Sequence, residues 1–69
     1  MTFTELKQAN SSEMYLYIDG NEDYKLYKHV WEFRSERSVT LYLVNVKDDS
    51  FQQVNNSRVK TVAGALKNV

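Results

Sequence analysis

The segment from residue 24 to residue 46 constrains the fold of this chain more than any other part. It reads YKLYKHVWEFRSERSVTLYLVNV and contains two runs rich in aromatic and β-branched residues, separated by the polar residues 35–38. Such residues favour β-strands, and a polar cluster between two apolar runs is typical of a turn. We therefore predict two antiparallel strands, at about 24–34 and 39–46, joined by a turn.

A further strand is predicted on the N-terminal side of this hairpin. Residues 14–18, MYLYI, alternate aliphatic and tyrosine side chains, which is the pattern of a strand whose two faces differ. The dipeptide Asp19-Gly20 follows, and it predicts a tight turn because both residue types tolerate positive φ. The strand at 14–18 is therefore expected to pair antiparallel with the strand at 24–34.

Residues 51–54, FQQV, allow two interpretations. They fit a short fourth strand, or the start of a longer helix that Asp49 or Ser50 would cap. Asn55 and Asn56 favour a break between residues 51–54 and the helix that follows. Both alternatives stay open from the sequence.

A short helix is predicted at residues 2–10. Thr2 can cap its start and Glu5 stands three residues later, which is the pattern of a capping box. Phe3 and Leu6 lie about one turn apart, and the polar residues 10–12 are expected to end the helix.

A longer helix is predicted from residue 57 to about residue 68, with Asn56 or Ser57 as its N-cap. Its expected buried stripe consists of apolar residues at helical spacing, namely Val59, Val62, Ala63 and Leu66. Gly64 inside this helix costs about 1 kcal/mol relative to alanine. We therefore expect the helix to pack closely on the sheet at Gly64.

These elements predict one small α+β domain spanning residues 1–69, with the order α-β-β-β-(β)-α and the helices packed on one face of an antiparallel sheet. A chain of 69 residues builds only a small core, so we expect a stability of a few kcal/mol. The aliphatic face of the sheet is expected to comprise Met14, Leu16, Ile18, Leu26, Val30, Leu41 and Leu43. The side chains expected to cover it are Phe3, Leu6, Val62 and Leu66.

The opposite face of the sheet is aromatic, and two short helices on the aliphatic face would leave it uncovered. A large exposed apolar patch usually marks an interaction surface, and tyrosine and tryptophan are frequent binding hot spots. A β-bulge in the strand at 24–34 is the alternative, because it would reverse the faces and bury Trp31 and Phe33. The candidate partner-binding residues are Tyr15, Tyr17, Tyr27, His29, Trp31 and Tyr42.

We expect a small non-enzymatic binding or regulatory protein that binds a protein partner, or forms a homodimer, through the aromatic face or an exposed strand edge. The alternative is a nucleic-acid-binding regulator, in which aromatic rings stack on bases and basic side chains contact phosphates. The net charge of zero disfavours this alternative, because phosphate contacts supply most non-specific affinity. The candidate phosphate contacts are Lys25, Lys28, Arg34, Arg37, Arg58 and Lys60.

The chain offers few groups for catalysis or metal binding. It contains no cysteine, one histidine (His29) and two glycines, which excludes thiolate zinc sites, cysteine nucleophiles and glycine-rich phosphate loops. The acids around Gly20 lack the spacing of a calcium-binding EF-hand. We expect no enzymatic activity, no cofactor and no metal. The sequence shows neither a signal-peptide pattern nor a membrane-spanning apolar run, so we expect a cytoplasmic location.

Overall fold

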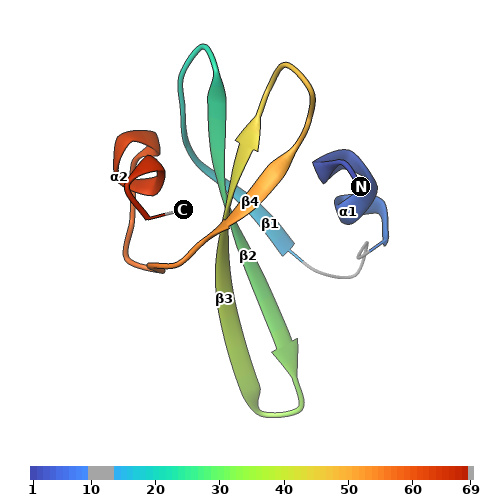
Figure 1. Cartoon of the computed structure of the whole chain (residues 1–69). Helices are drawn as coiled ribbons and strands as arrows, with labels where there is room; N and C mark the ends of the chain where they lie inside the picture. The colour runs from blue at the N-terminus through green and yellow to red at the C-terminus, as the bar shows by residue number, and fades with distance from the viewer. Residues whose placement is uncertain (10–13, 69) are drawn as a thin grey trace.

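The computed structural model describes residues 1–9 and 14–68, except for the side chain of Phe33. Its elements in chain order are α1 (Phe3–Ala9), β1 (Met14–Gly20), β2 (Tyr24–Phe33), β3 (Glu36–Asn45), β4 (Phe51–Val54) and α2 (Val62–Leu66). The strands form one antiparallel sheet in the order β1-β2-β3-β4 (Figure 1). The predicted α+β class and element order are confirmed, and residues 51–54 are a strand. The predicted helix end at residues 10–12 lies outside the described residues.

The β2–β3 hairpin is longer than predicted. Its pairing runs without interruption from Tyr24 opposite Asn45 to Phe33 opposite Glu36. The turn is therefore Arg34-Ser35, with Arg34 at φ 58, a left-handed conformation typical of the first position in two-residue hairpin turns. The prediction that residues 35–38 form the turn is wrong, because the backbone of residues 36–38 continues the strand. In Figure 1 this end of the hairpin projects beyond the rest of the molecule.

The uninterrupted pairing also settles which face each side chain of β2 occupies. Tyr27 lies opposite Tyr42, and Trp31 lies opposite Ser38, on the aromatic face. Leu26 lies opposite Leu43 on the aliphatic face. The alternative of a bulge in β2 that buries Trp31 is wrong, since β2 has no bulge and Trp31 is exposed.

The two helices lie on opposite faces of the sheet (Figure 1). The buried residues Val62 and Ala65 of α2 pack with side chains of the aliphatic face, namely Leu26, Leu41, Leu43 and Val54. Phe3 of α1 is buried too, but its ring lies 4.8 Å from the ring of Tyr27, on the aromatic face. The expectation that Phe3 and Leu6 cover the aliphatic face is therefore wrong. The sheet carries a small core on each side.

A β-bulge does occur, but in β1. Tyr17 pairs with Tyr27, whereas Asp19 pairs with Leu26, so Ile18 is an extra residue on β1. The bulge sends both Ile18 and Asp19 toward α2: Ile18 packs against the aliphatic core, and Asp19 Oδ2 accepts a hydrogen bond of 2.9 Å from the Val62 N–H. The predicted turn at Asp19-Gly20 is wrong, because neither residue has positive φ and β1 continues through Gly20.

α2 is shorter than predicted, because residues 57–61 are not helical. Asn56 Oδ1 accepts a hydrogen bond of 2.9 Å from the Arg58 N–H, a local turn that competes with helix formation. Thr61 has an extended backbone and is the N-cap, since its Oγ1 accepts a hydrogen bond of 3.0 Å from the Gly64 N–H. The predicted helix start is therefore wrong.

The segment before α2 crosses the aliphatic face from β4 to β1. It leaves β4 after Val54 and reaches the bulge of β1, where Val62 contacts Asp19. α2 then returns toward β4, and the Asn55 N–H donates a hydrogen bond of 3.0 Å to the Asn68 carbonyl. Residues 55–68 therefore form a closed loop over part of the sheet, which we call the C-terminal loop.

Gly64 faces the C-terminal loop itself. A Cβ atom at Gly64 would lie 3.2 Å from Thr61 Oγ1 and 3.4 Å from Val59 Cγ1. The tight packing expected at this glycine is present, but its neighbours belong to the loop rather than to the sheet.

α1 is held by its own capping box and by the β3–β4 turn. Thr2 Oγ1 accepts a hydrogen bond of 3.2 Å from the Glu5 N–H, and Glu5 Oε1 accepts one of 3.1 Å from the Thr2 N–H, which confirms the predicted capping box. Asp49 binds the first turn twice, through its carbonyl to the Phe3 N–H at 2.8 Å and through Oδ2 to the Thr4 N–H at 2.9 Å. Hydrogen bonding to Thr4 holds the pKa of Asp49 below its ordinary value of 3.8.

We expect Asp19→Ala to destabilise the fold by about 1 kcal/mol, the usual cost of losing a helix-capping acceptor. The substitution leaves the Val62 N–H at the start of α2 without its partner. Urea denaturation of the wild-type chain and of Asp19→Ala measures the difference in their free energies of unfolding. Asp19→Asn is the matched control, because its amide oxygen still accepts; an equal loss in both variants would contradict a capping role.

Candidate protein-binding surface

The six predicted aromatic-face residues do share one face of the sheet. Tyr15 of β1 stacks on His29 of β2, with ring centroids 4.4 Å apart and planes 9° from parallel. Tyr17 meets Tyr27 edge to face at 5.9 Å, and His29 lies 6.0 Å from Tyr42. The alternation of side chains in each strand was sufficient to group these residues correctly.

The centre of this aromatic face is covered by α1. The Phe3 ring lies 5.7 Å from Tyr15 and 6.2 Å from Tyr42, and it also contacts Phe51 of β4 at 6.0 Å. The Lys7 ammonium lies 5.2 Å from the centroid of the Phe3 ring, a cation–π contact that adds to the cover. The expectation of an uncovered aromatic face is therefore wrong for its centre, while Tyr17 and Trp31 remain exposed at its margin.

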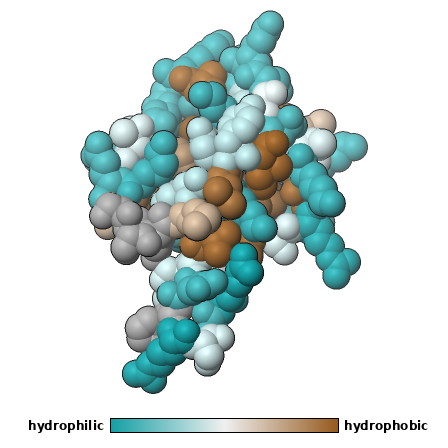
Figure 2. Space-filling view, turned by 180° about the vertical axis from the view of Figure 1, so that it is seen from behind, coloured by the Kyte–Doolittle hydropathy of each residue, from teal (hydrophilic) through white to brown (hydrophobic). Residues whose placement is uncertain are grey.

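The apolar surface that stays open lies on the aliphatic face, at the end away from α2. Met14, Val30 and Val39 form one row across β1, β2 and β3, and Leu16 lies in the next row. Met14 is 57% exposed, Leu16 44% and Val39 36%. We call these four residues the open aliphatic patch. Figure 2 shows apolar side chains reaching the surface in the middle of the molecule, above the hydrophilic end of the hairpin.

The patch is open because α2 is short. The prediction that the two helices cover the whole aliphatic face, including Met14 and Leu16, is wrong. α2 starts at Val62 and covers only the rows near Leu26. Leu66, which was predicted to cover the sheet, is itself exposed.

A cleft of about 310 Å³ lies where the C-terminal loop meets the open aliphatic patch. Strands supply its apolar floor and the loop supplies one wall; the lining residues are Ile18, Lys28, Val39, Leu41, Ser57, Arg58, Val59 and Lys60. Three of these are basic and none is acidic. Within residues 1–9 and 14–68, no carboxylate pairs with Lys28, Arg58 or Lys60. The cleft therefore combines an apolar floor with a positive rim.

The six predicted phosphate contacts do not form one surface. Lys28, Arg58 and Lys60 meet at the cleft, as described. Lys25 lies opposite Gly20 of β1 and Val44 of β3 in the sheet, and its side chain is on the aromatic face. The remaining two are at the projecting hairpin, where Arg34 occupies the turn and Arg37 Nε lies 3.8 Å from a Glu32 carboxylate oxygen.

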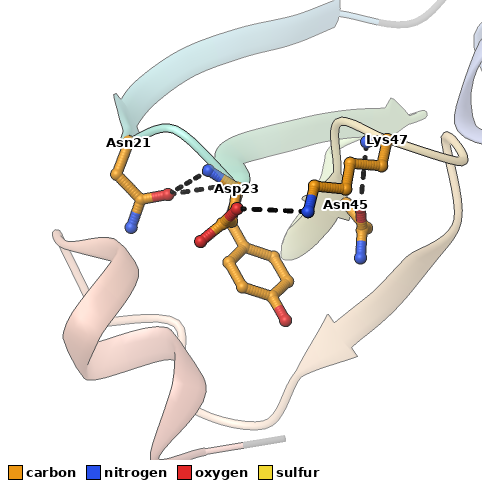
Figure 3. A network of polar contacts seen from close by, with 5 residues as sticks. Asn21, Asp23, Asn45 and Lys47 are labelled. Atoms are coloured by element: carbon orange, nitrogen blue, oxygen red, sulfur yellow. Dashed lines mark hydrogen bonds and ion pairs between the residues drawn. The ribbon is translucent and has the colours of Figure 1, made fainter.

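The acidic turn after β1 has a structural role (Figure 3). Asn21 Oδ1 accepts hydrogen bonds of 2.8 Å from the N–H groups of both Asp23 and Tyr24. Asp23 then joins this turn to the β3–β4 turn, because its carboxylate lies 4.0 Å from Lys47 Nζ and its carbonyl accepts a hydrogen bond from Val46 N–H at 3.0 Å. Asp19 points instead to α2, so the acids of this region do not converge. The described part of the chain contains no group of three side chains suited to a metal ion.

Sequence reasoning missed the open aliphatic patch and the cleft beside it. A usable signal was present in Thr61, a third possible N-cap whose hydroxyl can reach the N–H of the residue three positions later. Choosing Thr61 would have predicted the observed helix start at Val62.

Comparison of the chain with protein-family models, curated proteins and solved structures finds no significant match. Neither described helix has the length and apolar character needed to cross a bilayer.

Proposed function

We propose that this chain is a non-enzymatic interaction domain that binds another protein through the open aliphatic patch. The observation that carries the proposal is the joint exposure of Met14 and Leu16 on β1 and of Val39 on β3, on the same face of one sheet. Fully burying such a side chain is worth about 1.5–3 kcal/mol. A contiguous set of them on a protein surface is characteristic of a binding site.

The position of β1 supports a protein as the partner. β1 is at the edge of the sheet, with β2 as its neighbour on one side. An edge strand can pair with an extended segment of another chain through backbone hydrogen bonds. Met14 and Leu16 belong to this strand, so a segment added there would place its own side chains next to the patch.

The charge distribution favours a protein over a nucleic acid. Only three of the six candidate phosphate contacts meet at one place, and the net charge of the chain is zero. Nucleic-acid affinity depends on many simultaneous phosphate contacts. An apolar floor with a few cations is closer to the mixed composition of protein interfaces.

Site-specific photo-crosslinking in the native cells tests this proposal. A diazirine-bearing amino acid at position 16 is expected to yield a discrete protein adduct. The matched control is position 66, because Leu66 is 45% exposed and Leu16 44%, but Leu66 lies on α2 outside the patch. Substituting either exposed side chain is expected to change stability by no more than about 0.5 kcal/mol.

Three results would contradict the proposal. They are equal adducts at positions 16 and 66, no protein adduct at position 16, and an adduct that nuclease treatment removes. An adduct of twice the chain's mass would identify the partner as a second copy.

A further inference from the structure

The cleft beside the open aliphatic patch places positive charge against apolar surface. Lys28 is half-buried in the middle of β2, with Leu16 of β1 and Leu41 of β3 directly beside it in the sheet. A carboxylate brought next to the Lys28 ammonium group would form a charge-assisted hydrogen bond beside apolar surface. Lys28 has no acidic partner among the described residues, so this interaction is left for a ligand.

The C-terminal loop adds two further cations on the same side of the cleft. Arg58 and Lys60 flank Val59, which is half-buried and packs against the aliphatic core. Burial alternates along this part of the loop: Val59 is held against the core, and its neighbours Arg58 and Lys60 are exposed. Three cations from two separate elements thus converge on one cleft that has no acid in its lining.

We infer that the segment recognised by this surface is an extended, acidic and apolar stretch of the partner protein. This inference rests on the proposed function. Apolar side chains of the segment cover Met14, Leu16 and Val39, and its carboxylates lie against Lys28, Arg58 and Lys60. Charge complementarity with the cleft and the exposed apolar side chains beside it together select this occupant.

The size of the cleft is consistent with a peptide segment. Its volume of about 310 Å³ is at the lower end of the range for small-molecule sites. Such a cleft holds a few side chains rather than a folded domain. An apolar floor that includes Lys28, next to a wall that carries Arg58 and Lys60, matches a segment with both acidic and apolar residues.

A methyl and amide NMR titration of the full chain tests this inference. The probe is a capped nine-residue peptide of alternating Glu and Leu. We expect saturable shifts at the methyl groups of Met14, Val39 and Leu41 and at the amides of residues 57–60. The same peptide with Gln in place of Glu is expected to bind about tenfold more weakly, because its charge-assisted contacts are lost.

Three charge-reversal variants test which cations are responsible. Lys28→Glu is expected to weaken binding of the Glu-Leu peptide by about tenfold or more. Lys25→Glu is the matched control, because it makes the same charge change on the same strand but on the opposite face, and it should leave binding almost unchanged. Arg58→Glu changes an exposed loop position and provides the same test if Lys28→Glu does not fold.

Several outcomes would overturn the inference. They are the absence of saturable shifts with the Glu-Leu peptide, equal binding of the Gln-Leu peptide, and equal losses from Lys25→Glu and Lys28→Glu. Tighter binding of a single-stranded oligonucleotide or of phosphatidylserine vesicles at the same residues would also overturn it. If photo-crosslinking at position 16 still captures a protein in any of these cases, the proposed function stands and only the acidic character of the partner fails.

Discussion

Phe3→Ala is expected to lower the free energy of unfolding by about 3–5 kcal/mol, the usual cost of removing a buried aromatic ring. Phe3 is buried and contacts the rings of Tyr15, Tyr27, Tyr42 and Phe51. Its loss detaches α1 from the sheet and exposes the centre of the aromatic face. Because a domain of this size has only a few kcal/mol of stability in total, the variant is expected to be largely unfolded at 37 °C. Thermal denaturation followed by circular dichroism measures the effect.

Two controls separate the role of the Phe3 ring from the general effects of changing the N-terminus. Phe3→Leu keeps most of the buried volume and is expected to cost clearly less than Phe3→Ala. Met1→Ala changes an exposed side chain close by and should leave the melting temperature almost unchanged. A Phe3→Ala variant as stable as Met1→Ala would show that α1 is not needed on the aromatic face.

Leu26→Ala is expected to cost about 2–5 kcal/mol, whereas Leu16→Ala should cost less than about 1 kcal/mol. Both leucines belong to the aliphatic face on neighbouring strands. Leu26 is 0% exposed under α2, while Leu16 is 44% exposed in the open aliphatic patch. The same substitution at the two positions therefore compares the covered half of this face with the open half.

Equilibrium urea denaturation of the two variants measures this difference. Equal costs would mean that the covered and open halves contribute alike to the core, and that Leu16 is not available to a partner. A small cost at Leu16 together with loss of the crosslinked adduct would assign this leucine to binding rather than to folding.

The sequence was a good guide to the strands, and to their faces outside the β1 bulge. Alternation of Met14 and Leu16 with Tyr15 and Tyr17 predicts a two-faced strand whatever the rest of the chain does. The long β2–β3 pairing then keeps the aromatic and aliphatic sides separate. These properties depend on neighbouring residues, so local pattern was sufficient to predict them.

The positions of the helices depend on contacts between distant residues, and local pattern was not sufficient there. Phe3 can pack on either face, and its placement follows from the hydrogen bonds that Asp49 forms with the start of α1. The β1 bulge and the contact from Asp19 to Val62 likewise join residues far apart in sequence. No periodicity in the sequence indicates these contacts.

The prediction that the aromatic residues share one face of the sheet was correct, and the prediction that this face is uncovered was wrong for its centre. The aromatic residues were grouped correctly, but Phe3 covers their centre. Six basic residues were predicted as phosphate contacts, but only Lys28, Arg58 and Lys60 line the same cleft. The first difference arises because α1 lies on the aromatic face rather than on the aliphatic face. The second arises from the strands, because Lys25 lies on the opposite face of β2 from Lys28, and Arg34 and Arg37 lie at the projecting hairpin.

In the proposed interaction, the closed C-terminal loop separates residues that set the charge of the surface from the sheet that supports them. The hydrogen bond between the Asn55 N–H and the Asn68 carbonyl closes the loop, so its two ends lie side by side in the fold. The sheet supplies a constant floor, and the part of the loop that carries Arg58 and Lys60 supplies the charge of one wall. Exchanging Arg58 and Lys60 while keeping Val59, which packs against the aliphatic core, would therefore change the charge of the cleft without changing the strand order or either core.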